Sequence, residues 1–211
     1  QSLGDEVGED LDVKLGGGIV VAHDAAQMRL IEEKAKIEAT VGIETHILNR
    51  FELRRKAPYL SEDALGGGFC AGEGKANPLR VTPAIVRAAG AAGATLYRET
   101  PVFDLSGKAG KFSIETPRGT FRADKVINTA GAKAADVAAM LGMKIELSGF
   151  PLQVSVTEPI APLIPHLVYS AAGKLSLKQA TNGGCIIGGG WAAHQRDNGH
   201  LATNPTNFTG N

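Results

Sequence analysis

The run from Lys125 to Gly142 constrains the fold more than any other part of the sequence. Its first half, KVINTAG, is apolar and suited to a strand, and it passes through Gly131 into an alanine-rich stretch. The sequence therefore predicts a strand over 125–131, a tight turn, and a helix over 132–141. Because strand, turn and helix in succession belong to a sheet covered by helices, the run favours an α/β layer.

Two segments nearer the start carry strand and helix signals. The apolar run at 19–22 predicts a short strand. Asp24 follows as a helix cap, and apolar residues then recur every three to four positions between charged ones. This pattern predicts an amphipathic helix over 25–39.

Two further helix signals involve proline. Thr82 is a favourable cap and Pro83 suits a first turn, which predicts a helix over 83–92. A short polar helix within 48–60 must end at Pro58, because proline disfavours a helical conformation in the residue before it.

The rest of the chain consists mainly of short strand signals separated by glycine and proline turns. Before Pro151 they predict one strand over 94–97 and then a small antiparallel meander over 102–105, 111–116 and 120–123. After Pro151 they predict a second, antiparallel sheet over 152–157, 167–171, 175–179 and 185–187. The fold class that we expect is α/β (α+β).

Composition limits the class of function. The 211 residues are 43% hydrophobic and 21% charged, which is typical of a globular protein with a real core. Twenty-two basic residues balance twenty-two acidic ones, so no excess of positive charge indicates nucleic acid or an anionic membrane as a partner. A small-molecule ligand is the better expectation.

The cysteines and histidines show no metal-binding pattern. Cys70 and Cys185 are far apart, and the five histidines have no paired spacing, so we expect no metal site and no disulfide framework. This cysteine usage, together with the lack of a signal-peptide pattern, favours a cytoplasmic protein. The sequence lacks an initiator methionine and its end, NPTNFTGN, reads as uncapped coil, so we interpret both ends as cut points within a longer protein.

Two glycine-rich stretches match the loose dinucleotide pattern G-x-G-x-x-A, at 66–71 and 188–193. Neither stretch leads into an apolar helical repeat within a βαβ unit, so a glycine-permitted close approach of the backbone is the better interpretation of both. The sequence also lacks a G-x-S-x-G nucleophile elbow and a Walker loop. A bound cofactor that carries out the reaction would explain why the sequence has neither of these catalytic motifs.

The succession of motifs resembles the FAD-dependent D-amino-acid-oxidase superfamily, especially its branch of glycine oxidases, sarcosine oxidase β-subunits, cyanide-forming glycine dehydrogenases and opine oxidases. The resemblance spans nearly the whole chain. It rests on the order of six blocks, which are Gly16–Ala22, Gly66–Ala89, Gly93–Leu105, Lys125–Gly142, Val156–Pro159 and Gly183–Trp191.

The resemblance implies part of an FAD-binding Rossmann-like lobe interleaved with an antiparallel-sheet substrate lobe. On this basis residues 1–65 form the first part of the substrate lobe and residues 66–148 belong mainly to the FAD lobe. Residues 149–211 form the second part of the substrate lobe, whose C-terminal end is truncated.

The resemblance also implies where the cofactor is held. The residue at the position of Val102 presents its backbone to the adenine of FAD, and the turn Thr129-Ala130-Gly131 packs beside the cofactor. The family's N-terminal G-x-G-x-x-G finger and its last flavin-contacting segment are missing from the sequence. Because that finger grips the pyrophosphate, we expect FAD in the full-length protein but not in the isolated chain, which should be inactive.

The strands around four residues resemble those that line the substrate pocket over the flavin ring in relatives: Tyr169, Lys178, Gln179 and Trp191. The same residues are equally suited to the core or surface of a sheet. Lys178 or Arg196 can supply the cation that pairs with a substrate carboxylate. No catalytic residue is assigned, because in the family the flavin accepts the hydride.

The implied reaction is oxidation of the C–N bond of an amino acid or secondary amine, with the resulting imine hydrolysed by water. Two alternatives stay open: an FAD-dependent alcohol dehydrogenase of the glycerol-phosphate type, and a non-catalytic binding or assembly module of a hetero-oligomeric dehydrogenase. Expected partners are the small amine or amino-acid substrate and further subunits, like or unlike. Any association with a membrane would come through those partners.

Overall fold

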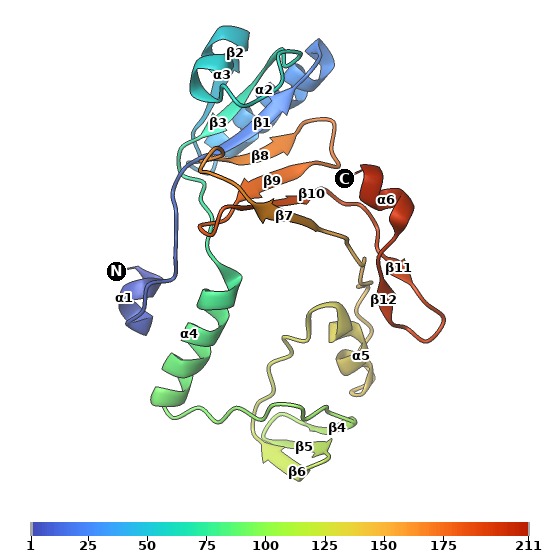
Figure 1. The fold of residues 1–211 in the computed structure, drawn as a ribbon. Coiled ribbons are helices and arrows are strands. Elements are labelled where there is room, and N and C mark those ends of the chain that lie inside the picture. Colours follow the sequence, from blue (N-terminus) through green and yellow to red (C-terminus); the bar gives the residue numbers. More distant parts are fainter. Residues whose placement is uncertain (1, 211) are drawn as a thin grey trace. The chain divides into compact units, whose positions relative to one another are not determined.

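The computed structural model describes residues 2–210, with side chains described as far as residue 207. The chain divides into two compact units (Figure 1). Residues 1–89 and 152–211 form the first, which we call the sheet unit, and residues 90–151 form the second, the meander unit.

The sheet unit is built on one seven-stranded mixed sheet with the order β2-β3-β1-β8-β9-β10-β7. Its strands are β1 (Gly18–Ala22), β2 (Thr45–Asn49), β3 (Gly66–Cys70), β7 (Ser155–Pro159), β8 (Leu167–Ser170), β9 (Ser176–Gln179) and β10 (Gly184–Gly188). Every neighbouring pair is antiparallel except β1 and β8, which run parallel.

The parallel pairing of β1 with β8 corrects the prediction of a separate second sheet. The strands predicted after Pro151 are present and antiparallel to one another, but they continue the sheet begun by β1 to β3 (Figure 1). The N–H groups of Leu167 and Ala171 donate to the carbonyls of Gly17 and Val21 at 3.0 and 2.8 Å. Alternation of side chains indicates which face of a strand is buried but not which strand lies beside it, so the sequence pattern missed this junction.

β3 is a strand in a glycine-rich stretch for which the sequence predicted no strand. The segment Gly66-Gly67-Gly68 lies between β1 and β2 and pairs with both. A Cβ on Gly67 would lie 2.5 Å from the carbonyl oxygen of Val20, and one on Gly68 would lie 2.7 Å from Cγ2 of Ile31. The interpretation of this stretch as a close backbone approach is therefore confirmed, and the glycines are required by packing on both faces.

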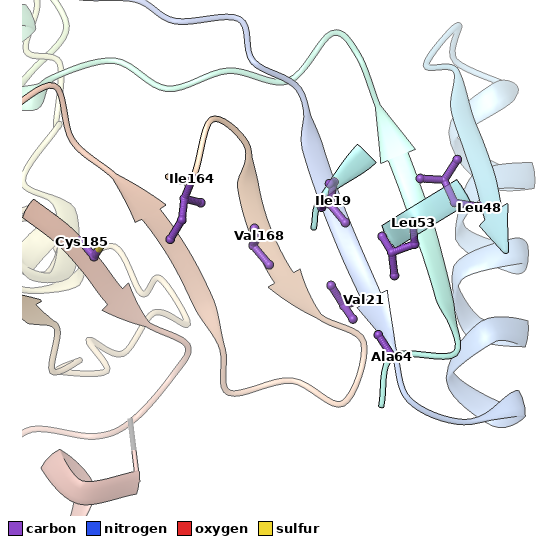
Figure 2. Close-up of a cluster of buried hydrophobic side chains, with 9 residues drawn as sticks. Ile19, Val21, Leu48, Leu53, Ala64, Ile164, Val168 and Cys185 are labelled. Carbon is purple, nitrogen blue, oxygen red and sulfur yellow. The ribbon is translucent and has the colours of Figure 1, made fainter. Parts of the chain in front are cut away.

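The core lies on one face of the sheet. Ile19 and Val21 of β1 and Val168 of β8 project to this face, where they meet Leu53 of α3 and Ile164 (Figure 2). Ile19, Leu53 and Val168 are all less than 2% exposed. The core therefore joins residues from both ends of the chain across the β1–β8 junction.

Two helices pack on the sheet at β1, β2 and β3. α2 (Ala25–Ala39) has the predicted bounds and the predicted cap, in which Asp24 accepts from the N–H of Gln27 at 2.8 Å. α3 (Arg50–Lys56) ends before Pro58 as expected, and Asn49 caps its first turn. Met28 and Ile31 of α2 face Gly66 and Gly68, whereas Leu53 of α3 faces Gly67, so the two helices cover opposite faces.

α4 (Pro78–Ala91) begins earlier than the sequence predicted. Asn77 caps it by accepting from the N–H of Leu79 at 3.0 Å, and Pro78 occupies the first turn. Pro83 therefore lies inside the helix instead of in its first turn. Because Asn77 and Pro78 supply the cap and the first-turn proline, the helix begins at Pro78, and the hydrogen bonds of the extra turn outweigh the loss at Pro83.

Four short elements near the two ends of the chain were not predicted from the sequence. α1 (Leu3–Val7) has a capping box between Ser2 and Asp5. At the other end, β11 (His194–Gln195) and β12 (Leu201–Ala202) form a hairpin, and α6 (Pro205–Gly210) follows Asn204, which accepts from the N–H groups of Thr206 and Asn207. The expectation of uncapped coil there was wrong because Asn204 and Pro205 provide the cap and first turn.

The meander unit contains the predicted three-stranded sheet: β4 (Asp104–Lys108), β5 (Lys111–Thr116) and β6 (Gly119–Ala123). The strands predicted over 94–97 and 125–131 are not formed. A 3-10 turn at Gly131–Lys133 and α5 (Ala134–Ala139) replace the predicted longer helix. Within the described residues no neighbouring strand pairs with the apolar segment around Ile127, which is 86% exposed, and a strand without a partner cannot form a ladder.

We predict that Gly67→Ala destabilises the protein by about 1–3 kcal/mol, because the added methyl group collides with the backbone of β1. Gly72→Ala is the matched control, since a Cβ there meets nothing within 4 Å. Urea unfolding of both variants measures the difference. Equal midpoints would show that the close packing of β3 on β1 is not needed for stability.

Candidate functional site

The candidate site lies on the face of the sheet opposite the core, where β8, β9 and β10 lie side by side. Tyr169 of β8 is opposite Ser176 of β9, and Lys178 of β9 is opposite Ile186 of β10. Alternation places these four side chains on one face, while Val168 and its neighbours point to the core. Because α2 packs on β1, β2 and β3, this part of the face is free to hold a ligand.

A cavity of about 330 Å³ lies on this face. Tyr169, Ser176, Lys178 and Ile186 line it from the sheet, and Lys75 lines it from the segment before α4. The structure therefore brings together two residues that the sequence predicted for substrate binding, Tyr169 and Lys178. A hydroxyl group, a phenol and two amino groups around an apolar floor suit a small ligand that carries a carboxylate.

Tyr169 also borders a second cavity, of about 420 Å³, that extends under α2 toward Lys34 and Glu73. Its side chain is 36% exposed. Burial, together with the negative charge of Glu73, raises the pKa of the Tyr169 phenol above its ordinary value. The phenol therefore stays protonated and can donate a hydrogen bond from the floor of either cavity.

Lys75 is a site residue that sequence reasoning missed. Its backbone pairs with that of Lys14 through two hydrogen bonds of 2.8 and 2.9 Å, which fixes its position. Its amino group donates to the carbonyl of Gln179. Burial and the nearby charge of Lys178 lower the pKa of the Lys75 amine. Only the fold brings these two lysines together, because no spacing rule connects a loop residue to a strand so far along the chain.

Gln179 lies on the other face of the sheet and is 4% exposed. Its side-chain oxygen accepts from the N–H groups of Leu163 and Ile164, at 2.7 and 3.0 Å. Its amide nitrogen donates to the carbonyls of Ile160, Ala161 and Gly183, at 3.0–3.2 Å. These bonds anchor the loop over 160–165, which lines a further cavity of about 950 Å³. Because the side-chain oxygen and nitrogen of Gln179 are already hydrogen-bonded within the protein, the predicted contact with substrate would have to replace some of these bonds.

Trp191 and Arg196 lie away from the cavity that Tyr169 and Lys178 share. The indole N–H of Trp191 donates to the carbonyl of Lys174 at 3.0 Å, and the amine of Lys174 lies 4.9 Å from the ring centroid. Arg196 is exposed and occupies the turn between β11 and β12, where its N–H donates to the carbonyl of His200. Their roles in substrate binding stay predictions.

The residues predicted to contact FAD belong to the meander unit. No described residue forms a hydrogen bond with the backbone of Val102, so its N–H and carbonyl are free. Asn128 shapes the turn at 129–131 by accepting from the N–H of Ala130 and donating to the carbonyl of Ala134. Gly131 has a positive φ of 56° and nothing lies within 4 Å of the position of its Cβ. Free backbone groups and small side chains fit the close approach of a flat ligand.

The second glycine-rich stretch is also explained by packing. Gly188 ends β10, and a Cβ on Gly189 would lie 2.2 Å from the backbone nitrogen of Leu175. Its φ of 142° favours glycine as well. Within the described residues, neither G-x-G-x-x-A stretch connects a strand to a helix, so neither forms the usual phosphate loop.

Comparison with known proteins identifies the class. The chain matches the family model described as FAD dependent oxidoreductase (DAO) over residues 1–208, and it belongs to that family. The resemblance drawn from the sequence is thereby confirmed.

Among curated relatives, glycine oxidase of Geobacillus kaustophilus is 32% identical over 137 residues, which cover 63% of this chain and 36% of the relative. Sarcosine oxidase subunit beta of Rhizobium meliloti is 25% identical over 196 residues, covering 89% and 47%. Human mitochondrial dimethylglycine dehydrogenase is 28% identical over 165 residues, covering 76% and 19%. The chain thus spans half or less of the length of these relatives.

Solved structures show the same fold. L-proline dehydrogenase from P. horikoshii superposes with a TM-score of 0.86 at 24% identity, over 98% of this chain and 56% of that one. Glycine oxidase from Geobacillus kaustophilus superposes with a TM-score of 0.81 at 24% identity, over 89% and 50%. The predicted α/β fold class is confirmed.

Neither a metal-binding cluster nor a membrane-spanning helix occurs among the described residues. They contain no group of three or more His, Cys, Asp or Glu side chains arranged to hold a metal ion. None of the helices described has the length and apolarity needed to cross a membrane.

We predict that Gln179→Leu lowers the free energy of unfolding by about 3 kcal/mol or more, because four backbone groups of the loop over 160–165 lose their hydrogen-bond partner. Lys178→Met, at the neighbouring position on the open face, should change it by less than about 0.5 kcal/mol. Thermal or urea unfolding compares the two. A Gln179→Leu variant as stable as the parent would show that Gln179 does not anchor the loop over 160–165.

Proposed function

We propose that the complete enzyme oxidises the C–N bond of an amino acid or secondary amine, and that the open face of β8, β9 and β10 forms one wall of its substrate pocket. Membership of the family over residues 1–208 supports the redox class. The names of the relatives, glycine oxidase, dimethylglycine dehydrogenase and sarcosine oxidase, support a small amino acid or its N-methyl derivative. The observation that carries the proposal is the cavity in which Tyr169 and Lys178 meet.

The residues of this chain bind and orient the substrate. Lys178 pairs with the carboxylate, since its amine lines the cavity and the described residues form no ion pair with it. The phenol of Tyr169, kept protonated by its raised pKa, donates a hydrogen bond to the same group or to the amine nitrogen. A fixed carboxylate leaves the C–H bond next to the nitrogen in one orientation, which lowers the entropic part of the barrier.

FAD, when bound, supplies the acceptor for the hydride that leaves the substrate carbon. In this chain the backbone of Val102 would contact its adenine, and the turn Thr129-Ala130-Gly131 would pack against it. The backbone of Val102 has no hydrogen-bond partner among the described residues, and the turn residues have small side chains. A flat cofactor can therefore approach both closely.

We further infer that the 211-residue chain alone binds FAD poorly. Neither glycine-rich stretch among its described residues has the strand-to-helix setting that grips a pyrophosphate. The apolar segment around Ile127, next to the proposed cofactor turn, has no neighbouring strand to hold it within the described residues. Weak FAD binding would leave this chain without the oxidation activity of the complete enzyme.

A flavin titration tests this inference. We expect no saturable quenching of FAD fluorescence with the 211-residue chain, and stoichiometric binding with the full gene product. Bleaching of the bound flavin by an amino acid or secondary amine would support the proposed reaction. Failure of both proteins to bind flavin would contradict it and favour the alternative of a binding or assembly module.

In the flavin-loaded gene product, we predict that Lys178→Met raises KM for the amino-acid substrate on the order of tenfold and changes kcat little, because a charge-assisted bond to the bound carboxylate is lost. Steady-state kinetics of Arg196→Met provide the control, since Arg196 lies in the β11–β12 hairpin and not among the residues that line this cavity. A raised KM in Arg196→Met alone would move the carboxylate partner to Arg196. An unchanged KM in both variants would end both assignments.

A further inference from the structure

A second polar hollow, of about 400 Å³, lies on the core-facing side of the sheet beside α3. It is lined by Leu48, Glu52, Arg55, Lys56 and His166. It shares no lining residue with the cavity of Tyr169 and Lys178, because α3 covers the opposite face of the sheet. The proposed oxidation makes no use of it.

His166 is the unusual member of this hollow. It is only 8% exposed, and its Nδ1 lies 2.7 Å from the hydroxyl of Tyr59. The Tyr59 ring stacks on it and the edge of Phe69 meets it, with centroid distances of 6.0 and 5.9 Å. These contacts fix the ring, and no described residue forms a hydrogen bond with its other nitrogen, Nε2. A buried ring nitrogen without a partner at the wall of a polar hollow calls for a ligand.

Cations surround the hollow. Arg55 forms no ion pair with any described residue, whereas the neighbouring Arg54 is paired with Glu62. The amine of Lys56 lies 3.7 Å from the centroid of the Phe69 ring, close to the imidazole that this ring also contacts. The one acidic wall residue, Glu52, already accepts from the N–H of Asn49 in the capping box. The hollow therefore has a net positive charge, and the tautomer in which Nδ1 accepts from the Tyr59 hydroxyl adds an Nε2–H donor that has no described partner.

We propose that this hollow binds a small oxyanion, a carboxylate or phosphate group, held by Arg55, Lys56 and the Nε2–H of His166. Basic residues in the last turn of α3 also complement its C-terminal carbonyls, and that role alone would explain their presence. It would not explain a buried imidazole held by Tyr59 with one nitrogen unpaired at the same wall. An oxyanion satisfies both the surplus of positive charge and the unpaired donor.

The proposal implies a dependence on pH. Burial and the charges of Lys56 and Lys75 lower the pKa of the His166 imidazole, which favours the neutral ring when no anion is bound. The groups around it are Glu52, Arg55 and Lys56 on α3, the Tyr59 hydroxyl, and Lys75. A bound anion favours the protonated ring and raises its pKa. Binding therefore takes up a proton and becomes tighter as the pH falls.

The test follows the imidazole signals of the 211-residue chain by NMR while phosphate or acetate replaces chloride at constant ionic strength. We expect one histidine, identified by its loss in His166→Gln, to show a pKa that rises with either anion and a shift that saturates. Signals of His166 that respond to both anions no more than to chloride would overturn the proposal. If His166→Gln fails to fold, the same signal is assigned in the parent chain by its nuclear Overhauser contacts with the rings of Tyr59 and Phe69, so the measurement stays decisive.

A matched pair of variants on one helix provides the second test. We expect Arg55→Gln to weaken phosphate binding, measured by titration calorimetry near pH 6, on the order of tenfold. Arg54→Gln removes the same charge from the same turn, but its guanidinium is paired with Glu62 and does not line the hollow, so its effect should be below about twofold. Equal effects of the two substitutions would show only general electrostatic attraction and would also overturn the proposal.

Discussion

The parallel ladder between β1 and β8 is the interaction on which the rest of the sheet unit depends. It joins a strand from the first quarter of the chain to one from the last quarter, through the register Gly18↔Leu167 to Val21↔Ser170. The core residues Ile19 and Val168 become neighbours only across this ladder, and both are almost completely buried. The core cluster takes residues from both halves of the sheet, so without this ladder Val168 would lose its neighbour Ile19 and the single core would be divided.

The ladder also separates two faces with different chemistry. Alternation along β8 and β9 sends Val168 and Gln179 inward and leaves Tyr169 and Lys178 on the open face. On the inward face, the polar side chain of Gln179 holds the loop over 160–165 by hydrogen bonds. The outward face keeps its polar groups available for a ligand. Gln179 is therefore structural and Lys178 is available for binding because adjacent residues of a strand point to opposite faces.

Much of the fold could be predicted from local signals. The cap at Asp24, the period of the helix over 25–39 and the turns of the meander are set by residues close in sequence, and the structure shows them as expected. The glycine strand at 66–68 and the start of α4 were missed. A strand of glycines has no side-chain pattern to read, and a proline that suits a first turn is also tolerated inside a helix when a better cap precedes it.

The order of the motifs was enough to predict the family and the fold class, and the family resemblance suggested Tyr169 and Lys178, which the fold places at one cavity. This was possible because each motif consists of residues close together in the sequence. Only the tertiary structure decided that Gln179 faces the core, that Lys75 joins Lys178, and that His166 lies buried against Tyr59. These contacts join residues far apart along the chain, and the pairing of β1 with β8, which no local pattern encodes, places their partners beside them.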